Sequence, residues 1–201
     1  MEHIRIIAPG DPGFDWLYDL YMQSFPVHEQ RLRERQEGVL GHPEYHCDLL
    51  CQGETRVGLL MWWAGPGFRY VEHFAIAPQL RGQSWGSRAL REFLAEGDPV
   101  VLEIDPQGAL SVMENASDYV SVFILPPSFE DLRVRLHTRN TDDPVEIERR
   151  LNNARGEVRK VDHYQYAIIN DNLELAYTQL QSIVRAEKQR TSRFHPHILD
   201  D

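Results

Sequence analysis

The chain has 201 residues, of which 42% are hydrophobic, and it carries a formal net charge of -10 with a sequence pI near 5.3. This length suits one sizeable α/β domain or two small ones with a buried core. The acidic balance argues against a general affinity for nucleic acid or for an anionic membrane surface, so small molecules are the expected partners.

The first 13 residues lack the basic and apolar stretches of a signal peptide, and no later run is apolar enough to span a bilayer. A cytoplasmic location is therefore expected. Cys47 and Cys51 are the only cysteines, and their spacing of four places both on one face of a predicted strand. They are too far apart for an easy disulfide, and His42 and His46 nearby do not complete a metal site, so buried thiols and no metal are expected.

The first half of the chain predicts a strand at residues 3–8, a helix from Phe14 to about Ser24, and a charged helix after Pro26. Residues 45–52, 57–64 and 69–77, separated by glycine-containing turns, predict a three-stranded antiparallel meander. A loop at 81–86 then leads into an amphipathic helix that ends near Gly97, and residues 100–105 form the next strand.

Beyond Asp105 the pattern changes to a regular alternation of helices and strands. Residues 107–116 predict a helix, 119–125 a strand, and Ser128 and Asp143 each precede a helix. Residues 164–170 predict a strand, and Asn172 precedes the last helix. Such alternation is typical of a parallel sheet covered by helices.

The loop RGQSWG, Arg81–Gly86, lies between a predicted strand and a predicted helix. A loop in this position can direct consecutive backbone N–H groups and the positive end of the helix dipole at a phosphate. The alternative is a tight turn that merely starts a helix.

The surrounding segment HFAIAPQLRGQSWGSRALREFL resembles the acetyl-CoA-binding segment of the GCN5-related N-acetyltransferases, with Gln79, Gly82 and Ser84 at the pattern positions. The resemblance covers the first half of the chain. It implies that acetyl-CoA is the cofactor and that Glu72 is the general base for an acceptor amine, although a solvated carboxylate is the alternative. His73 is expected on the opposite face of the strand. The implied cofactor-binding residues are Phe74, Ala75, Ile76, Arg81, Gly82, Gln83, Ser84, Trp85 and Gly86.

The acetyltransferase family continues with a tyrosine-bearing helix and two further strands, and no such segment follows Asp105. Instead, residues from LEIDPQGA to about Arg193 resemble guanylate kinase in several blocks, including FILPPSFEDLRVRL and YAIINDNLELA. The resemblance implies that Asp105 lies near a metal ion and the guanine nucleotide and that Asn170 contacts adenine. It also implies that Arg139 and Arg150 contact phosphates, which suits phosphoryl transfer by charge neutralisation.

The front half of that kinase is not matched. No G-x-x-x-x-G-K-[ST] pattern occurs, and no lysine precedes Lys160. The GMP-binding segment of the kinase is also expected to be absent.

The sequence therefore predicts a composite α/β chain with its joint within residues 99–108. Residues 1–105 are expected to form an acetyltransferase-like mixed sheet with helices, and 106–201 a parallel-sheet kinase half that lacks its P-loop. Impaired acetyl transfer to an amine is the main functional expectation. The alternatives are guanylate kinase activity with Mg-ATP and GMP, which is not expected, and a chain without catalytic function.

Overall fold

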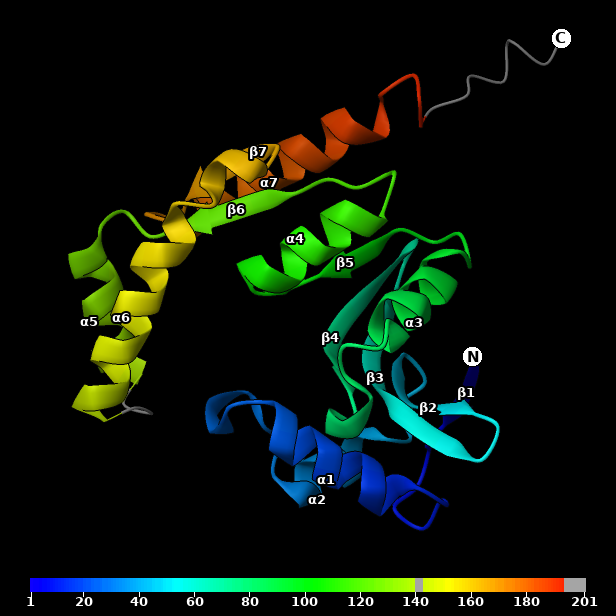
Figure 1. The fold of residues 1–201 in the computed structure, drawn as a ribbon. Coiled ribbons are helices and arrows are strands. Elements are labelled where there is room, and N and C mark those ends of the chain that lie inside the picture. The colour runs from blue at the N-terminus through cyan, green and yellow to red at the C-terminus, as the bar shows by residue number, and fades with distance from the viewer. Residues whose placement is uncertain (140–142, 194–201) are drawn as a thin grey trace, which may run out of the picture. The chain divides into compact units, whose positions relative to one another are not determined.

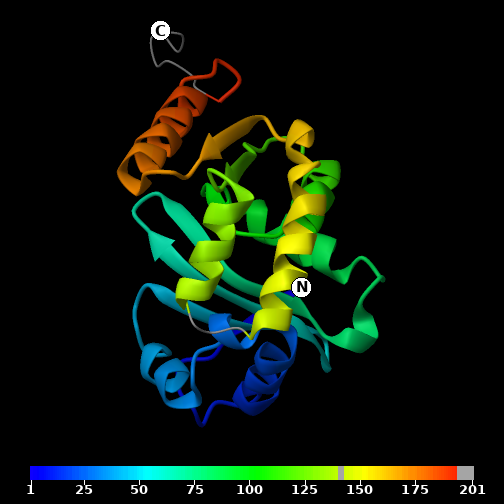
Figure 2. The same cartoon turned by 90° about the vertical axis from the view of Figure 1, so that its left-hand side faces the viewer.

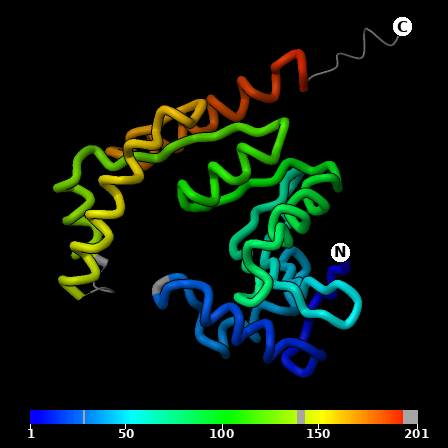
Figure 3. The backbone as a smooth tube through the Cα atoms, viewed as in Figure 1, coloured from blue at the N-terminus to red at the C-terminus, as the bar shows by residue number. Residues whose placement is uncertain are grey.

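The structure is a computed structural model that describes residues 1–139 and 143–193, apart from the side chains of His28 and Arg139. The chain forms two compact units, Met1–Asp105 (unit 1) and Pro106–Asp201 (unit 2), whose path can be followed in Figures 1 and 3. The elements of unit 1 are β1 (Glu2–Arg5), α1 (Phe14–Ser24), η1 (Val27–Glu29), α2 (Arg33–Val39), β2 (Tyr45–Gln52), β3 (Thr55–Gly65), β4 (Phe68–Ile76), η2 (Pro78–Leu80), α3 (Trp85–Leu94) and β5 (Val100–Leu102).

Unit 1 is built on a five-stranded mixed sheet in the order β1-β2-β3-β4-β5. Strands β1 to β4 pair antiparallel, and β5 pairs parallel with β4. Gly53 and Gly67 adopt positive φ angles of 57° and 76° in the two hairpin turns, a conformation that glycine adopts without steric cost. The predicted meander and the mixed α/β class are thereby confirmed.

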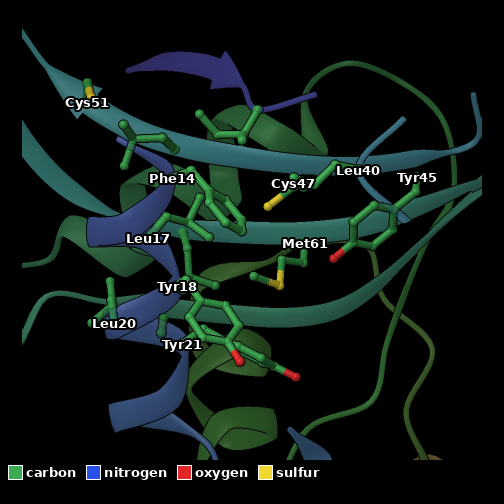
Figure 4. Close-up of a cluster of buried hydrophobic side chains, with 14 residues drawn as sticks. Phe14, Leu17, Tyr18, Leu20, Tyr21, Leu40, Tyr45, Cys47, Cys51 and Met61 are labelled. Carbon is green, nitrogen blue, oxygen red and sulfur yellow. The ribbon is translucent and has the colours of Figure 1, made fainter. Parts of the chain in front are cut away.

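Apolar side chains on the two faces of this sheet form separate cores. One core lies against α1, where the ring of Phe14 and the side chains of Leu17 and Tyr21 pack on β2 and β3 (Figure 4). Cys47 and Cys51 both belong to this core as buried free thiols, which confirms their shared face. The other core lies against α3, whose Ala89 and Phe93 are buried.

A β-bulge interrupts the pairing of β3 with β4. Met61 lies opposite His73 and Trp62 opposite Val71, which leaves Glu72 as the extra residue. Two consecutive side chains of β4 are thus turned toward the α1 side of the sheet, because a bulge resets the alternation of faces. The prediction that His73 points away from the face of Glu72 is therefore wrong.

Unit 2 contains α4 (Pro106–Asn115), β6 (Val122–Leu125), α5 (Phe129–Arg139), α6 (Pro144–Val158), η3 (Val161–His163), β7 (Tyr166–Ile169) and α7 (Leu173–Lys188). Strands β6 and β7 pair parallel, and helices α5 and α6 lie side by side (Figure 2). The predicted capping residues are in place: Ser128, Asp143 and Asn172 accept backbone N–H groups of the helices that follow them.

Some predicted elements are shorter in the structure. The segment 119–125 forms a strand only from Val122, and the charged segment after Pro26 contains a 3-10 turn, η1, before helix α2 begins at Arg33. Extended strands need a neighbour to pair with, and among the described residues β6 pairs only with β7. This explains why an apolar run of seven residues yields four residues of strand.

A buried carboxylate on α7 links this helix to β7 and to the segment that follows α7. Glu187 on α7 is only 4% exposed, and it accepts hydrogen bonds from the hydroxyl of Tyr166 on β7 and from Arg193. Arg190 lies 2.8 Å from the same carboxylate, and Arg193 also bonds to Asp118 at 2.8 Å. The hydrogen bond from Tyr166 and the two arginines hold the pKa of Glu187 below its usual value.

We expect Glu187→Gln to flatten the acid dependence of unit 2. A folded-state pKa below the unfolded value of about 4.3 stabilises the fold above that pH, and this stabilisation is lost as the pH falls through the folded-state pKa. Amide hydrogen exchange of α7 between neutral pH and the acid range measures the effect. Glu174→Gln, at an exposed position of the same helix, should keep the wild-type profile. Equal profiles for the wild type and Glu187→Gln would contradict this assignment.

Candidate functional site

The residues that the sequence singles out divide between the two units. Glu72, the loop Arg81–Gly86 and Asp105 belong to unit 1, whereas Arg150 and Asn170 belong to unit 2. The side chain of Arg139, at the last position of α5, lies outside the described residues, so its predicted role stays a prediction.

Glu72 is held in a half-buried ion pair. Its Oε1 lies 2.5 Å from the guanidinium of Arg31, and its Oε2 accepts the indole N–H of Trp63 at 3.1 Å. Arg31 lies over the ring of Tyr45, with its guanidinium carbon 5.4 Å from the ring centroid. Burial lowers the pKa of Arg31, but the hydrogen bond and charge of Glu72 outweigh burial and leave that pKa raised. The partner of Glu72 is a residue that sequence reasoning missed, because the two lie 41 positions apart.

The bulge places a buried imidazole beside this pair. His73 is 7% exposed and lies between the rings of Tyr21 and Phe25, with centroid distances of 4.9 and 4.6 Å. Its Nδ1 has no hydrogen-bond partner among the described residues. Burial lowers the pKa of His73. The neutral form is thereby favoured, because a charged imidazole would lose its hydration here.

We expect Glu72→Gln to lower the stability of unit 1 by about 1 kcal/mol, because a neutral amide replaces a charged partner of a half-exposed Arg31. All four tryptophans, Trp16, Trp62, Trp63 and Trp85, lie in unit 1, so tryptophan fluorescence during urea unfolding measures this unit alone. Glu54→Gln, in an exposed turn, is the matched control. An unchanged midpoint and emission maximum for Glu72→Gln would show that the ion pair contributes nothing.

The loop before α3 contains two positions in the left-handed backbone region. Gly82 and Ser84 both adopt positive φ angles, 74° and 62°, and Ser84 is the only described non-glycine residue that does so. Arg81 bends back to the carbonyl of Ile76 at 3.0 Å and to Ser24 Oγ at 3.3 Å. A pocket of about 160 Å³ is lined by Gln83, Ser84, Trp85 and Arg88. Binding of a cofactor by this loop stays a prediction.

Arginines and a strand end define the candidate site in unit 2. Arg150 is half-buried on α6, one position before the fully buried Leu151. Asn170 follows β7, and its carbonyl accepts the guanidinium of Arg135 on α5 at 2.7 Å. Arg133 on α5 is bonded to Glu148 on α6. Arg135 and Arg133 were not predicted as site residues. Their arrangement fixes the two helices that carry the predicted phosphate contacts.

In the part of the chain that the structure describes, no three His, Cys, Asp or Glu side chains form a group that could hold a metal ion. No described helix has the length and apolar character needed to cross a membrane.

Unit 2 is thus an α/β unit in which a parallel strand pair is joined by two helices that both carry half-buried arginines. The guanylate kinase family model matches residues 72–187. The chain belongs to the guanylate kinase family. The match begins at Glu72, well before the joint predicted at residues 99–108. The predicted joint within residues 99–108 stays a prediction, and the family match extends over the predicted joint into the preceding segment.

Curated relatives agree with the family model. The guanylate kinase of Clostridium perfringens is 39% identical over 131 residues, which are 65% of this chain and 60% of that protein. The guanylate kinase of Geobacter sulfurreducens is 42% identical over 125 residues, 61% of this chain and 62% of that protein. The chain thus spans about 60% of the length of these relatives.

Solved structures of two kinds are similar to parts of the chain. Guanylate kinase from Anaplasma phagocytophilum is 25% identical and covers 80% of this chain and 65% of its own, with a TM-score of 0.43. A putative GNAT-family acetyltransferase from Bacteroides thetaiotaomicron is 26% identical and covers 52% of this chain and 61% of its own, with a TM-score of 0.49. TM-scores this low do not assign a fold, so the family assignment rests on the sequence matches.

These matches overturn the main functional expectation. Acetyl transfer to an amine was predicted from the segment around residues 72–86, but that segment lies inside the guanylate kinase match, and the curated relatives are guanylate kinases. The short phosphate-type loop misled the prediction, because different classes of phosphate-binding protein use similar strand–loop–helix geometry.

Proposed function

We propose that the chain functions in the manner of a guanylate kinase, by binding the guanine and adenine nucleotides of that reaction through the arginine-bearing helices of unit 2. The observation that carries this proposal is the family match over residues 72–187, together with about 40% identity to guanylate kinases over more than 120 residues. In this proposal Arg139 and Arg150 contact phosphates and Asn170 contacts the adenine base. Planar guanidinium groups suit phosphate oxygens because they donate two parallel hydrogen bonds.

Mg²⁺ would accompany ATP in this reaction. Protein kinases and ATPases usually hold Mg²⁺ through one or two carboxylates and the substrate phosphates, without a dedicated cage of protein ligands. The exposed carboxylate of Asp105, three residues after the end of β5 and directly before α4, fits such a role. In this proposal Asp105 lies near the metal ion and the guanine nucleotide.

The rate of phosphoryl transfer depends on how the chain holds the phosphates of ATP. The 201 residues contain no G-x-x-x-x-G-K-[ST] segment and no lysine before Lys160. Phosphoryl transfer depends on neutralising and positioning the γ-phosphate, which such a loop and its lysine provide. We therefore propose nucleotide binding as the function of this chain by itself, with slow phosphoryl transfer.

We also propose that the chain is composite, with the division near Asp105, and that unit 1 has an acetyltransferase-like fold without that activity. The separation of the chain into two compact units at Asp105 supports this division, and the mixed sheet of unit 1 supports the proposed fold. The cytoplasmic location stays a prediction.

Isothermal titration of the full chain with GMP and with ATP plus Mg²⁺ tests the proposed function. We expect saturable binding of both nucleotides, and a coupled assay for ADP should give a rate well below that of the C. perfringens enzyme. Absence of heat and of competition between nucleotides at millimolar ligand would refute nucleotide binding. Turnover equal to that of the C. perfringens enzyme would refute the limit set by the missing loop.

A further inference from the structure

Helices α5 and α6 are joined by contacts of two kinds. The apolar side chains of Leu136, Ile147 and Leu151 form the core between them. Two charged side chains, Arg133 on α5 and Glu148 on α6, are bonded to each other across the same interface. Apolar packing has no preferred direction, whereas a hydrogen bond has one. The Arg133–Glu148 bond therefore adds a directional constraint to the way in which α6 lies on α5.

This ion pair is partly exposed to solvent. The side chains of Arg133 and Glu148 are 34% and 52% exposed. The hydrogen bond from Arg133 holds the pKa of Glu148 below its ordinary value, so both groups are charged at neutral pH. An exposed pair of this kind contributes little to stability, because water screens its charges. Its loss should consequently leave unit 2 folded, so that an effect on ligand binding can be measured.

Helix α5 is also bonded to Asn170, the residue that follows β7. The guanidinium of Arg135 donates to the carbonyl of Asn170 at 2.7 Å, and the N–H of Asn170 donates to the carbonyl of Leu125 at 2.7 Å. Both backbone polar groups of Asn170 are thereby fixed. Each helical residue advances about 100° around the axis, so the side chains of Arg133 and Arg135 leave α5 on nearly opposite sides. One helix thus contacts α6 through one arginine and the end of β7 through the other.

In the proposed function, α5 therefore links two contacts to the same nucleotide. Asn170 contacts the adenine base of ATP, and Arg150, two positions after Glu148 on α6, contacts the phosphates. When two parts of one ligand bind to two sites, the gain over the separate parts depends on whether the spacing of the sites lets both engage at once. GMP has no adenine base, so its binding does not depend on this spacing.

We propose that Arg133 and Glu148 are positioning residues that set the spacing between Asn170 and Arg150, so that the base and the phosphates of ATP engage together. The inference rests on the proposed function, because it deepens the assignment of Asn170 and Arg150 as contacts of ATP. Neither member of the pair touches the nucleotide. The pair favours ATP over ligands that carry only the base or only the phosphates.

Arg133→Gln and Glu148→Gln, alone and together, test this proposal in isothermal and NMR titrations of the full chain. Each single variant should weaken the binding of ATP about three- to tenfold, and the double variant should weaken it no further, because all three lose the same contact. Adenosine and inorganic tripolyphosphate, added separately, should keep their wild-type dissociation constants within about twofold, and so should GMP. Parallel weakening of every ligand would show a merely structural role and overturn the proposal.

Arg149→Gln and Glu146→Gln, alone and together, are the matched controls, because this pair carries the same charges but lies within α6. They should change the binding of ATP by less than about twofold. Equal losses for the two pairs, or unchanged ATP binding in Arg133→Gln and Glu148→Gln, would overturn the positioning role and leave the proposed function standing. A wild-type chain that binds neither ATP nor GMP would refute the proposed function and the positioning role together.

Discussion

Arg150→Ala is expected to weaken the binding of GMP and ATP by about 10- to 100-fold. A charge-assisted hydrogen bond contributes about 1.5–3 kcal/mol, and each 1.4 kcal/mol changes a dissociation constant about tenfold. Arg150 is half-buried on α6, directly before the buried Leu151, so its backbone is well fixed. A fixed arginine loses less conformational entropy when it binds a phosphate than one on a mobile segment.

Arg149→Ala is the matched control for this prediction. Arg149 is exposed on the same helix and bonds to Glu146, one turn earlier, at 2.5 and 2.7 Å. Its removal alters the net charge as Arg150→Ala does, but it should change the dissociation constants by less than about twofold. Isothermal titration at one ionic strength compares the variants. Equal losses for the two variants would mean that net charge, not a phosphate contact, governs binding.

Leu151→Ala is expected to destabilise unit 2 by about 2–5 kcal/mol, the usual cost of a large-to-small change in a core. Leu151 is 1% exposed and packs with Leu136 and Ile147 between α5 and α6. This core contains few buried side chains, so few neighbours can move to fill the cavity that the substitution leaves. Because α6 also carries Arg150, nucleotide binding should weaken along with the stability of unit 2.

Two measurements distinguish the destabilisation of unit 2 from any change in the stability of unit 1. Amide hydrogen exchange of α5 and α6 should accelerate, whereas the urea midpoint from tryptophan fluorescence should not move, since all four tryptophans lie in residues 1–105. Val145→Ala, 80% exposed on the same helix, should alter neither probe by more than about 0.5 kcal/mol. A shift of the tryptophan transition in Leu151→Ala would contradict independent cores in the two units.

Local sequence signals predicted much of the fold. The hairpin glycines, the capping residues Ser128, Asp143 and Asn172, and the alternating apolar pattern act over a few residues, and each is in place. The bulge at Glu72 was not predicted, because it depends on how β3 pairs with β4 and on no local pattern. The face of His73 was misassigned for the same reason.

The sequence predicted less of the candidate site than of the fold. The ion pair of Arg31 with Glu72 and the contact of Arg135 with Asn170 join residues that are distant in the chain, so spacing rules give no signal. The loop Arg81–Gly86 has a clear local pattern, but the pattern is shared by different phosphate-binding proteins, and it led to the wrong main function. The blocks around Arg150 and Asn170 were more specific because several of them occur in one order.

An NMR titration of the labelled full chain with GMP, ATP and acetyl-CoA, each added separately, tests nucleotide binding by unit 2 most directly. We predict that GMP and ATP shift amide signals near Arg150 and Asn170 saturably, and that Arg150→Ala raises the ligand concentration needed for these shifts by about 10- to 100-fold. The account would be contradicted if acetyl-CoA shifted the amides of residues 81–86 saturably while neither nucleotide shifted any signal of unit 2.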